Sequence, residues 1–283
     1  MKPATTFGPK PWLQMSWDAR AAANFIFGGA GTGLAVTAAF FVAPAPGWRV
    51  LIALALVLVA MGLGSVWLEL GRPWRFANVA FNPRTSWMTR EAYASGFVFA
   101  SGGAAILTGT AWLAWACALA CLVFVYCQSR MLRAAKGIPA WRVPSLSPFI
   151  VATGMSEGAG LAVALAPALL DATPRWAVAF LVAAVLARLA AWWRYSASLR
   201  GKVAPQAREA LDAAGTHVIV LGTIVPLVAV GIAFALPAAA GVALTVGGLA
   251  ALAAGWRAKF AIVRRAAYNQ GFALPVLPVR GTR

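Results

Sequence analysis

The sequence has 283 residues, of which 61% are hydrophobic and 11% are charged, and its mean hydropathy is +0.77. That leaves too little polar surface to cover a soluble globular protein, so the composition indicates a membrane protein. The formal net charge of +17 would suggest nucleic-acid binding if it lay on one soluble face. Here the basic residues are divided among short segments between apolar runs, which argues against that class.

The first 17 residues are polar and contain proline, and the apolar run that follows is long enough to cross a membrane. We therefore expect no cleavable signal, and we expect this run to stay in the mature protein. All three cysteines, Cys117, Cys121 and Cys127, fall in one later apolar run. We expect them to be small buried hydrophobic residues rather than a disulfide or metal framework.

A membrane-spanning helix needs about 20 apolar residues, and eight such runs follow one another along the chain. They are residues 20–43, 50–70, 91–108, 111–128, 145–170, 175–193, 211–236 and 238–256. The sequence therefore predicts an all-α membrane protein with eight transmembrane helices. Only Gly109 and Thr110 separate the third and fourth runs, and Pro237 separates the last two, so both pairs should form tight hairpins.

The distribution of basic residues predicts the orientation of these helices. Every lysine and arginine except Arg49, Arg175 and Arg188 falls in a segment on one side, with Lys259 counted in a C-terminal tail, 258–283. Segments rich in lysine and arginine stay in the cytoplasm, so we expect both termini to be cytoplasmic. Arg188 lies inside the sixth run near its basic end, where its side chain could snorkel to the interface.

A weak internal repeat relates residues 31–36 (GTGLAV) to residues 158–163 (GAGLAV), four predicted spans later. A repeat at that distance keeps its orientation, which suggests one polytopic domain, 1–283, built from two four-helix halves, 17–130 and 145–257, related by an axis along the membrane normal.

Two glycine pairs lie in or beside the repeated segments. Gly29 and Gly33, and likewise Gly154 and Gly158, have the GxxxG spacing that lets helix backbones approach closely. Helix packing explains these glycines without any further role.

Charged residues are concentrated in the segment 67–92, between the second and third runs. It holds Glu69 and Glu91, two of only seven carboxylates in the chain. If the second helix continues for one more turn, Glu69 and Arg72 share a face and can pair, and an ion pair at a helix end would be sufficient explanation. Other polar residues at the same depth in the membrane favour a binding site here instead.

Cationic donors, an indole donor and carboxylates at the border of an apolar interior suit a quinone headgroup. Its carbonyls accept hydrogen bonds, and its reduction takes up two electrons and two protons. The third span opens with Trp87, Arg90 and Glu91, and the first with Asp18, Arg20 and Asn24. The predicted quinone-binding residues are Arg72, Trp87, Arg90, Glu91, Asp18, Arg20 and Asn24.

Four residues are candidates for a proton relay, namely Glu91, Glu69, Glu157 and His217. Glu157 lies near the middle of the fifth run, where it could be a protonated acid bonded to a neighbouring helix or part of a proton path. His217, the only histidine, lies early in the seventh run near Asp212 and could shuttle protons or simply be packed.

One histidine and no cysteine cluster provide no ligand set for haem or an iron–sulfur centre. We therefore expect no metal in this chain. Electrons for any redox chemistry would have to come from another subunit on the basic cytoplasmic face.

Several segments resemble a known family. Residues 68–73 (LELGRP), 82–91 (NPRTSWMTRE) and 17–29 (WDARAAANFIFGG) resemble the NrfD/PsrC/DmsC membrane-anchor family of molybdenum oxidoreductases. Together with residues 127–142 and 269–275, they are similar to subunits grouped with phenylacetyl-CoA:acceptor oxidoreductase. The resemblance covers nearly the whole chain.

The resemblance implies an eight-helix quinone-reactive anchor without haem, bound to a four-cluster iron–sulfur subunit that in turn binds a molybdopterin catalytic subunit. It implies that electrons pass between this cytoplasmic partner, which would oxidise phenylacetyl-CoA, and ubiquinone or menaquinone in a bacterial inner membrane. Glu91 falls on the acidic position tied to quinol binding in the DMSO reductase anchors. Glu69 departs from those anchors, which carry histidine there.

Two alternatives remain open on the sequence. A secondary transporter also uses pseudo-symmetric halves and a midplane carboxylate such as Glu157, and a passive structural anchor needs no site at all. Most polar residues gather at one membrane edge rather than at the centre, which favours the docking and quinone site.

Overall fold

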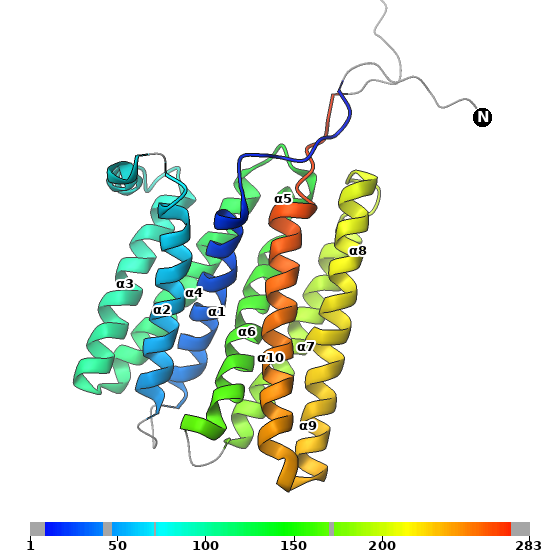
Figure 1. The fold of residues 1–283 in the computed structure, drawn as a ribbon. Coiled ribbons are helices and arrows are strands. Elements are labelled where there is room, and N and C mark those ends of the chain that lie inside the picture. Colours follow the sequence, from blue (N-terminus) through cyan, green and yellow to red (C-terminus); the bar gives the residue numbers. More distant parts are fainter. Residues whose placement is uncertain (1–8, 42–46, 71, 170–172, 273–283) are drawn as a thin grey trace, which may run out of the picture.

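In the part of the chain that the structure describes, the regular structure is helical, as the apolar runs predict. The computed structural model describes residues 9–41, 47–70, 72–169 and 173–272 (Figure 1). The long helices are α1 (Ala19–Ala39), α2 (Trp48–Trp67), α3 (Trp87–Thr108), α4 (Ala111–Ala134), α6 (Leu146–Leu169), α7 (Arg175–Ser198), α8 (Pro205–Ile219), α9 (Val225–Ala235) and α10 (Ala240–Phe260). The short ones are η1 (Pro73–Phe81), α5 (Pro139–Arg142), η2 (Val220–Ile224), η3 (Pro237–Ala239) and η4 (Ala261–Arg265).

Seven helical segments of the described chain are long and apolar enough to cross a membrane, which suggests a multi-pass membrane protein. Five are single helices, α1, α2, α4, α6 and α7. The other two are composite, because α8, η2 and α9 run on as Pro205–Ala235, and η3, α10 and η4 as Pro237–Arg265. The sequence predicts eight spans, and α3 is the one that does not reach this hydropathy, although it has 22 residues. Its first turns carry Arg90 and Glu91, and serine and glycine recur along it.

Several helices continue beyond the predicted apolar runs at their basic ends. Helix α4 ends at Ala134 rather than 128, α7 at Ser198 rather than 193, and the last segment reaches Arg265 rather than 256. The predicted tail is thus helical up to Arg265. A helix satisfies its own backbone hydrogen bonds and can leave the apolar layer without interruption, which is why hydropathy alone underestimates its length. The predicted ends at 43 and 170 lie outside the described residues.

Both predicted hairpins are confirmed. Helices α3 and α4 are joined by Gly109 and Thr110 alone, with Gly109 in the left-handed conformation at φ 70°. Glycine adopts this conformation without strain and therefore often ends a helix. Pro237 begins the short turn η3 between α9 and α10.

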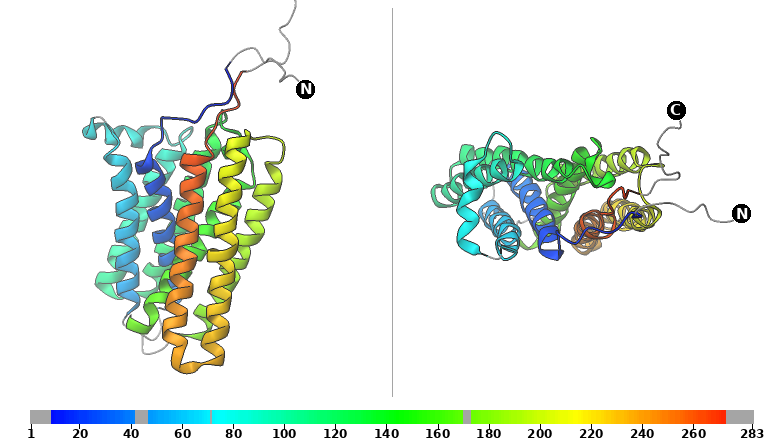
Figure 2. Two further views of the ribbon diagram at one scale, coloured as in Figure 1. Left: turned by 45° about the vertical axis from the view of Figure 1, so that its right-hand side comes forward. Right: turned by 90° about the horizontal axis from the view of Figure 1, so that it is seen from above.

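Helices α1 and α6 pack against each other at the centre of the bundle, through both predicted glycine pairs (Figure 2). A side chain added at Gly33 would strike the backbone of Gly154, and one added at Gly158 would strike the backbone of Gly33. A side chain at Gly154 would lie 3.0 Å from the carbonyl oxygen of Gly29. The GxxxG spacing thus creates the closest helix contact of the two repeated segments.

The remaining packing follows the same pattern in each half. Helix α1 contacts α2 and α4, while α6 contacts α7 and α10; across the centre, α4 contacts α6 and α10 contacts α1. This pairing is the one that a repeat of four helices, related by an axis along the helices, would produce.

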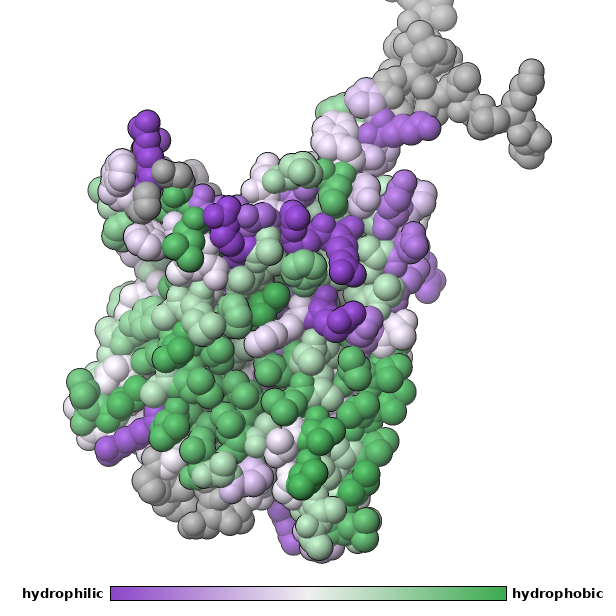
Figure 3. Space-filling view, in the orientation of Figure 1, coloured by the Kyte–Doolittle hydropathy of each residue, from purple (hydrophilic) through white to green (hydrophobic). Residues whose placement is uncertain are grey.

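The first and last described segments lie side by side at one end of the bundle (Figure 1). The backbone N–H of Trp12 donates to Asn269 Oδ1 at 3.1 Å, and Leu13 forms an isolated antiparallel bridge with Tyr268. Hydrophilic residues are gathered at this end in the face shown by Figure 3, and hydrophobic residues cover most of the rest. We call this the basic end.

Candidate functional site

A cavity of about 910 Å³ opens between α1, α2, η1 and α3 near the basic end. Its walls are mainly apolar, with a few polar groups among them, which is typical of pockets that bind small organic molecules. The lining residues are Ser16, Trp17, Ala21, Asn24, Phe25, Leu63, Val66, Trp67, Glu69, Leu70, Arg75, Phe76, Asn78, Val79, Asn82, Ser86, Met88, Thr89, Glu91, Ala92, Ser95 and Met131. We call it the α1–α3 cavity.

Glu91 lines this cavity although it is only 4% exposed. Ser86 begins α3 as its N-cap, accepting from Thr89 N, and so fixes the first turns that carry Glu91. The Glu91 Oε1 atom accepts a hydrogen bond of 3.2 Å from Asn24 Nδ2 on α1. Gln128 Nε2 on α4 in turn donates to the backbone oxygen of Asn24 at 2.9 Å. Three helices therefore hold the carboxyl in place.

The Glu91 carboxyl has no cationic partner in the described part of the chain. The ion pairs found there join Arg20 to Asp18, Arg208 to Asp212 and Lys259 to Glu157. Amide side chains are its polar neighbours, and the two carboxyl oxygens offer about four acceptor positions, so part of its hydrogen-bonding capacity stays free. Glu91 is thus available to a molecule in the cavity.

Glu69 lines the same cavity, just beyond the end of α2. It is half-buried, and this desolvation raises the pKa of its carboxyl above the usual value. The negative charge of Asp18 acts in the same direction, while Arg20 opposes it. Glu91 and Glu69 are thus two carboxyl groups on one cavity, one in its wall and one near solvent.

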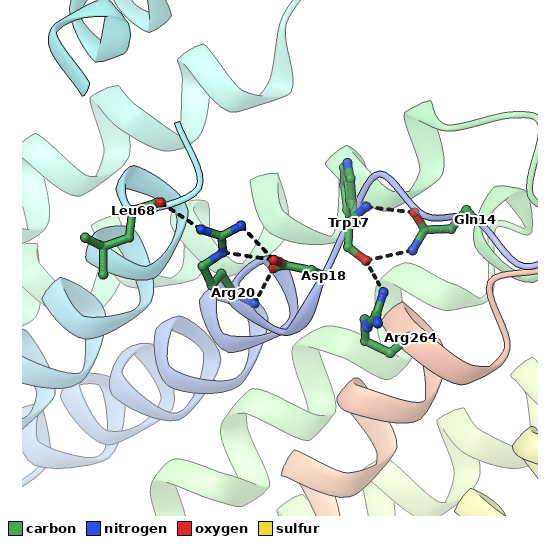
Figure 4. Close-up of polar contacts among 6 residues, drawn as sticks. All are labelled: Gln14, Trp17, Asp18, Arg20, Leu68 and Arg264. Carbon is green, nitrogen blue, oxygen red and sulfur yellow. Dashed lines mark hydrogen bonds and ion pairs between the residues drawn. The ribbon is translucent and has the colours of Figure 1, made fainter. Parts of the chain in front are cut away.

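Asp18 and Arg20 tie the start of α1 to the end of α2 (Figure 4). Asp18 is the N-cap of α1, accepts from the backbone N–H of Arg20 at 2.7 Å and pairs with its guanidinium at 2.8 Å. These bonds from Arg20 hold the pKa of the Asp18 carboxyl below its usual value. Arg20 Nη1 also donates to the backbone oxygen of Leu68 at 2.9 Å. Both residues therefore position the cavity wall without lining it.

The proposed pair of Glu69 and Arg72 is not formed. Helix α2 ends at Trp67, so the two residues do not share a helical face. Arg72 is exposed and precedes η1, a helix that the sequence analysis missed. Pro73 starts this helix, which brings Arg75 and other η1 side chains to the cavity.

Trp87 and Arg90 lie beside the site, outside the lining of the cavity. The guanidinium of Arg90 stacks over the Trp87 ring at 4.2 Å, and that of Arg130 lies 4.4 Å from the same ring. Arg90 also donates to the backbone oxygens of Pro83 and Arg84, each at 2.8 Å. These contacts fix the loop before α3.

Glu157 is fully buried and bonded to a neighbouring helix, which is one of the two roles expected from the sequence, although its partner there is a lysine. Its Oε2 atom pairs with Lys259 Nζ at 2.5 Å. Lys259 was assigned to the tail, yet it belongs to α10 and is completely buried. Glu157 lines neither the α1–α3 cavity nor the second cavity described below.

Arg188 does not snorkel to the interface as expected. It is completely buried and donates to the backbone oxygens of Ala251, at 2.8 Å, and Gly222. Gly222 belongs to the π-helical turn η2. Such turns interrupt the regular bonding of a helix, and here a carbonyl of the turn accepts from Arg188 in the bundle interior.

His217 lies apart from the predicted quinone residues. It belongs to α8 and lines a second, smaller cavity of about 390 Å³ between α1, α8 and α10. Its Nδ1 bonds to the backbone oxygen of Ala213 at 2.7 Å, whereas nearby Asp212 pairs with Arg208.

Sequence reasoning missed several polar residues at these sites, and four of them show why. Gln128 was visible as a polar residue at the end of an apolar run, and Arg75 and Asn78 as polar residues in a connecting segment. Lys259 was hidden because basic residues follow it closely in the sequence. No pattern in the sequence pairs it with Glu157.

The three cysteines are free and buried, as expected. Within the described ranges, no cluster of histidine, cysteine and acidic side chains could hold a metal ion.

Comparison of the sequence with models of known protein families gives no match, and comparison with curated proteins gives none either. The resemblance to the NrfD/PsrC/DmsC anchors therefore stays a prediction.

Proposed function

We propose that this chain is the quinone-reactive membrane-anchor subunit of an oxidoreductase. One observation carries the proposal: Glu91, a buried carboxyl without a cationic partner in the described chain, forms part of the wall of a largely apolar cavity of about 910 Å³. A buried acid is costly among apolar side chains, so a membrane protein retains one mainly where it has a function.

The α1–α3 cavity suits a quinone in size and chemistry. Pockets of about 300–1,000 Å³ hold small organic ligands, and apolar walls fit the ring and the start of an isoprenoid tail. Glu91 and Asn24 would hold the headgroup, and Glu91 can accept a hydrogen bond from a hydroxyl of the reduced form. A quinone bound here would supply two-electron, two-proton redox chemistry.

The two carboxyl groups of the cavity divide the proton handling between them. Glu91 exchanges a proton with the headgroup in the buried wall. Glu69, half-buried at the end of α2, exchanges a proton with solvent, and its raised pKa brings it closer to neutral pH, where proton transfer is most effective. His217 and Glu157 lie elsewhere and have no part in this route.

The proposed topology has eight spans, with α3 as the eighth. Two observations support it: α3 has 22 residues, enough to cross a bilayer, and the first and last described segments pair at one end, which requires an even number of crossings. We propose that this end faces the cytoplasm from a bacterial inner membrane, and the excess of basic residues there supports this orientation.

Electrons would reach the cavity from a partner on the basic end. We propose a four-cluster iron–sulfur subunit that carries a molybdopterin catalytic subunit, with phenylacetyl-CoA as the substrate, since a CoA thioester is a cytoplasmic compound. Purification of the intact complex tests this directly. Iron, molybdenum and phenylacetyl-CoA-dependent quinone reduction should copurify with the chain, whereas a transporter would purify alone.

A single substitution tests the role of the cavity. Glu91→Gln keeps the size of the side chain but cannot exchange a proton, so quinone-coupled turnover should be lost while the complex assembles and reduces artificial acceptors. Glu209→Gln is the matched control, because Glu209 is an exposed acid on α8 that lines neither cavity. Unchanged quinone reduction in the Glu91→Gln complex would refute the assigned role.

A further inference from the structure

The second cavity, with a volume of about 390 Å³, is lined by several side chains that can donate hydrogen bonds. Arg257 on α10 and Arg265 on η4 both line it, and so does His217 on α8. In the described part of the chain, neither guanidinium takes part in an ion pair or has a hydrogen-bond acceptor, and Arg265 only lies over the Phe260 ring at 5.7 Å. Two arginines are thus left without a counter-charge in one cavity.

A third donor belongs to another residue that lines the same cavity. Trp256 contributes to the lining, and its Nε1 atom is buried without a partner in the described chain. Its ring packs edge-on against Phe27 at 5.2 Å, which holds the indole in position. A buried N–H without an acceptor is costly, so this indole would gain from an acceptor beside it.

No carboxylate balances these donors from the neighbouring helices. The acids on α8 are Glu209 and Asp212; neither lines the cavity, and Asp212 pairs with Arg208. The group that fits must therefore carry several acceptor oxygens and negative charge, as a phosphate does.

The position of the cavity identifies the kind of phosphate. It opens between α8 of one composite span and α10 of the other, close to their basic ends. Further along the same spans, α9 and α10 expose large apolar side chains, including Phe234, Val242 and Val246. Basic pockets between transmembrane helices at this depth bind anionic lipid headgroups, with the acyl chains below them.

We propose that this cavity binds the phosphate of an anionic membrane phospholipid. Arg257 and Arg265 bind the phosphate oxygens, Trp256 donates from the interior, and the apolar faces of α9 and α10 accept the acyl chains. The proposal concerns a site separate from the α1–α3 cavity and does not depend on the quinone function.

The test uses the full chain purified in a neutral detergent and depleted of lipid. Its melting temperature is measured with added phosphatidylglycerol, with phosphatidylcholine and with inorganic phosphate. A ligand that binds the folded state raises the melting temperature, so phosphatidylglycerol should raise it and the other two should not. An equal rise with inorganic phosphate, or with phosphatidylcholine, would overturn the assignment to an anionic lipid.

Two variants localise the effect. Each basic residue contributes about fivefold to binding at an anionic membrane surface, so Arg257→Gln with Arg265→Gln should bind roughly 30-fold more weakly. The matched control is Arg194→Gln with Arg200→Gln, which removes two exposed arginines outside this cavity. A lipid response that is the same in both double variants would reject the site.

A further variant keeps the charges and blocks the space. Ala210 lines the cavity and is only partly buried, so Ala210→Trp can fill it without entering the core. This variant should also lose the response to phosphatidylglycerol, and native mass spectrometry should show one fewer retained lipid than in the unaltered chain. A full response in Ala210→Trp would contradict the proposal even if the arginine variants fail to fold.

Discussion

Lys259 on α10 and Glu157 on α6 form an ion pair whose side chains are both completely buried, with Nζ and Oε2 2.5 Å apart. Arg188 lies in the same half of the bundle, also completely buried, and donates to carbonyl oxygens of α10 and η2. These three charged side chains make closed contacts in the interior, whereas Glu91 lines a cavity.

Removal of one partner of the buried pair should be costly. Lys259→Met keeps an unbranched side chain one atom shorter but leaves Glu157 without its counter-charge, and breaking such a pair typically costs about 3–5 kcal/mol. We expect a large fall in the melting temperature of the purified chain. The double variant Glu157→Gln with Lys259→Met should recover most of that loss, since no unpaired charge remains. Lys202→Met, at an exposed lysine, is the control.

The contact between α1 and α6 makes a second prediction. At Gly158 an added methyl group would strike the backbone of Gly33, which cannot move aside as a flexible side chain could. Gly158→Ala should therefore separate the helices, at a cost of about 1–3 kcal/mol or more. Gly103→Ala on α3 meets no atom within 4 Å and should be neutral or slightly stabilising. Equal melting temperatures for these two variants would show that the central contact is looser than described.

Hydropathy and spacing were sufficient to predict much of this fold. Apolar runs marked the position of every long helix, short connections marked both hairpins, and glycine spacing marked two places where helix backbones approach closely. These features depend on local sequence or on one type of side chain. Hydropathy did not predict where the helices end at the basic end of the bundle. There, helices such as α4 and α10 continue through polar residues, because their backbone hydrogen bonds do not depend on hydropathy.

The candidate site was predicted only in part. Asn24 and Glu91 open different spans, and the sequence suggested correctly that they meet. The role of Gln128 depends on the rotation of α4 about its axis, and that of Lys259 on how α10 faces α6. The rotation of a helix about its axis is set by packing with its neighbours. A single sequence therefore does not show which polar groups line a cavity and which form a buried ion pair.

Glu69 and Asp18 should give opposite pH effects on stability. The pKa of Glu69 is raised in the folded chain, so the unfolded chain loses its proton first and stability falls as pH rises from the ordinary value toward the raised one. Glu69→Gln removes this loss. Its melting temperature relative to the unaltered chain should therefore increase as pH rises through that interval.

The pKa of Asp18 is lowered, so its ionised form stabilises the folded chain above the ordinary pKa, and this contribution is lost as pH falls through the lowered one. Asp18→Asn should be less stable at neutral pH, and the difference should shrink in acid. Melting curves measured from about pH 3 to 8, a range that includes the ordinary pKa values of Asp and Glu, would check the direction of both effects. Differences that do not change with pH would contradict these assignments.

Substitutions can distinguish the role of Arg90, which we expect to stabilise the fold, from that of Asn24, which we expect to bind the quinone. Arg90 donates to the backbone oxygens of Pro83 and Arg84 and stacks on Trp87, outside the cavity lining. Arg90→Gln should therefore lower the free energy of unfolding by about 1–2 kcal/mol and leave the KM for quinone unchanged. Asn24→Leu removes the donor to Glu91 within the cavity wall and should raise that KM severalfold. Melting curves and quinone titrations of the two variant complexes separate these effects. A raised KM with unchanged stability for Arg90→Gln would instead assign this arginine to the headgroup, as its place beside Glu91 in the sequence first suggested.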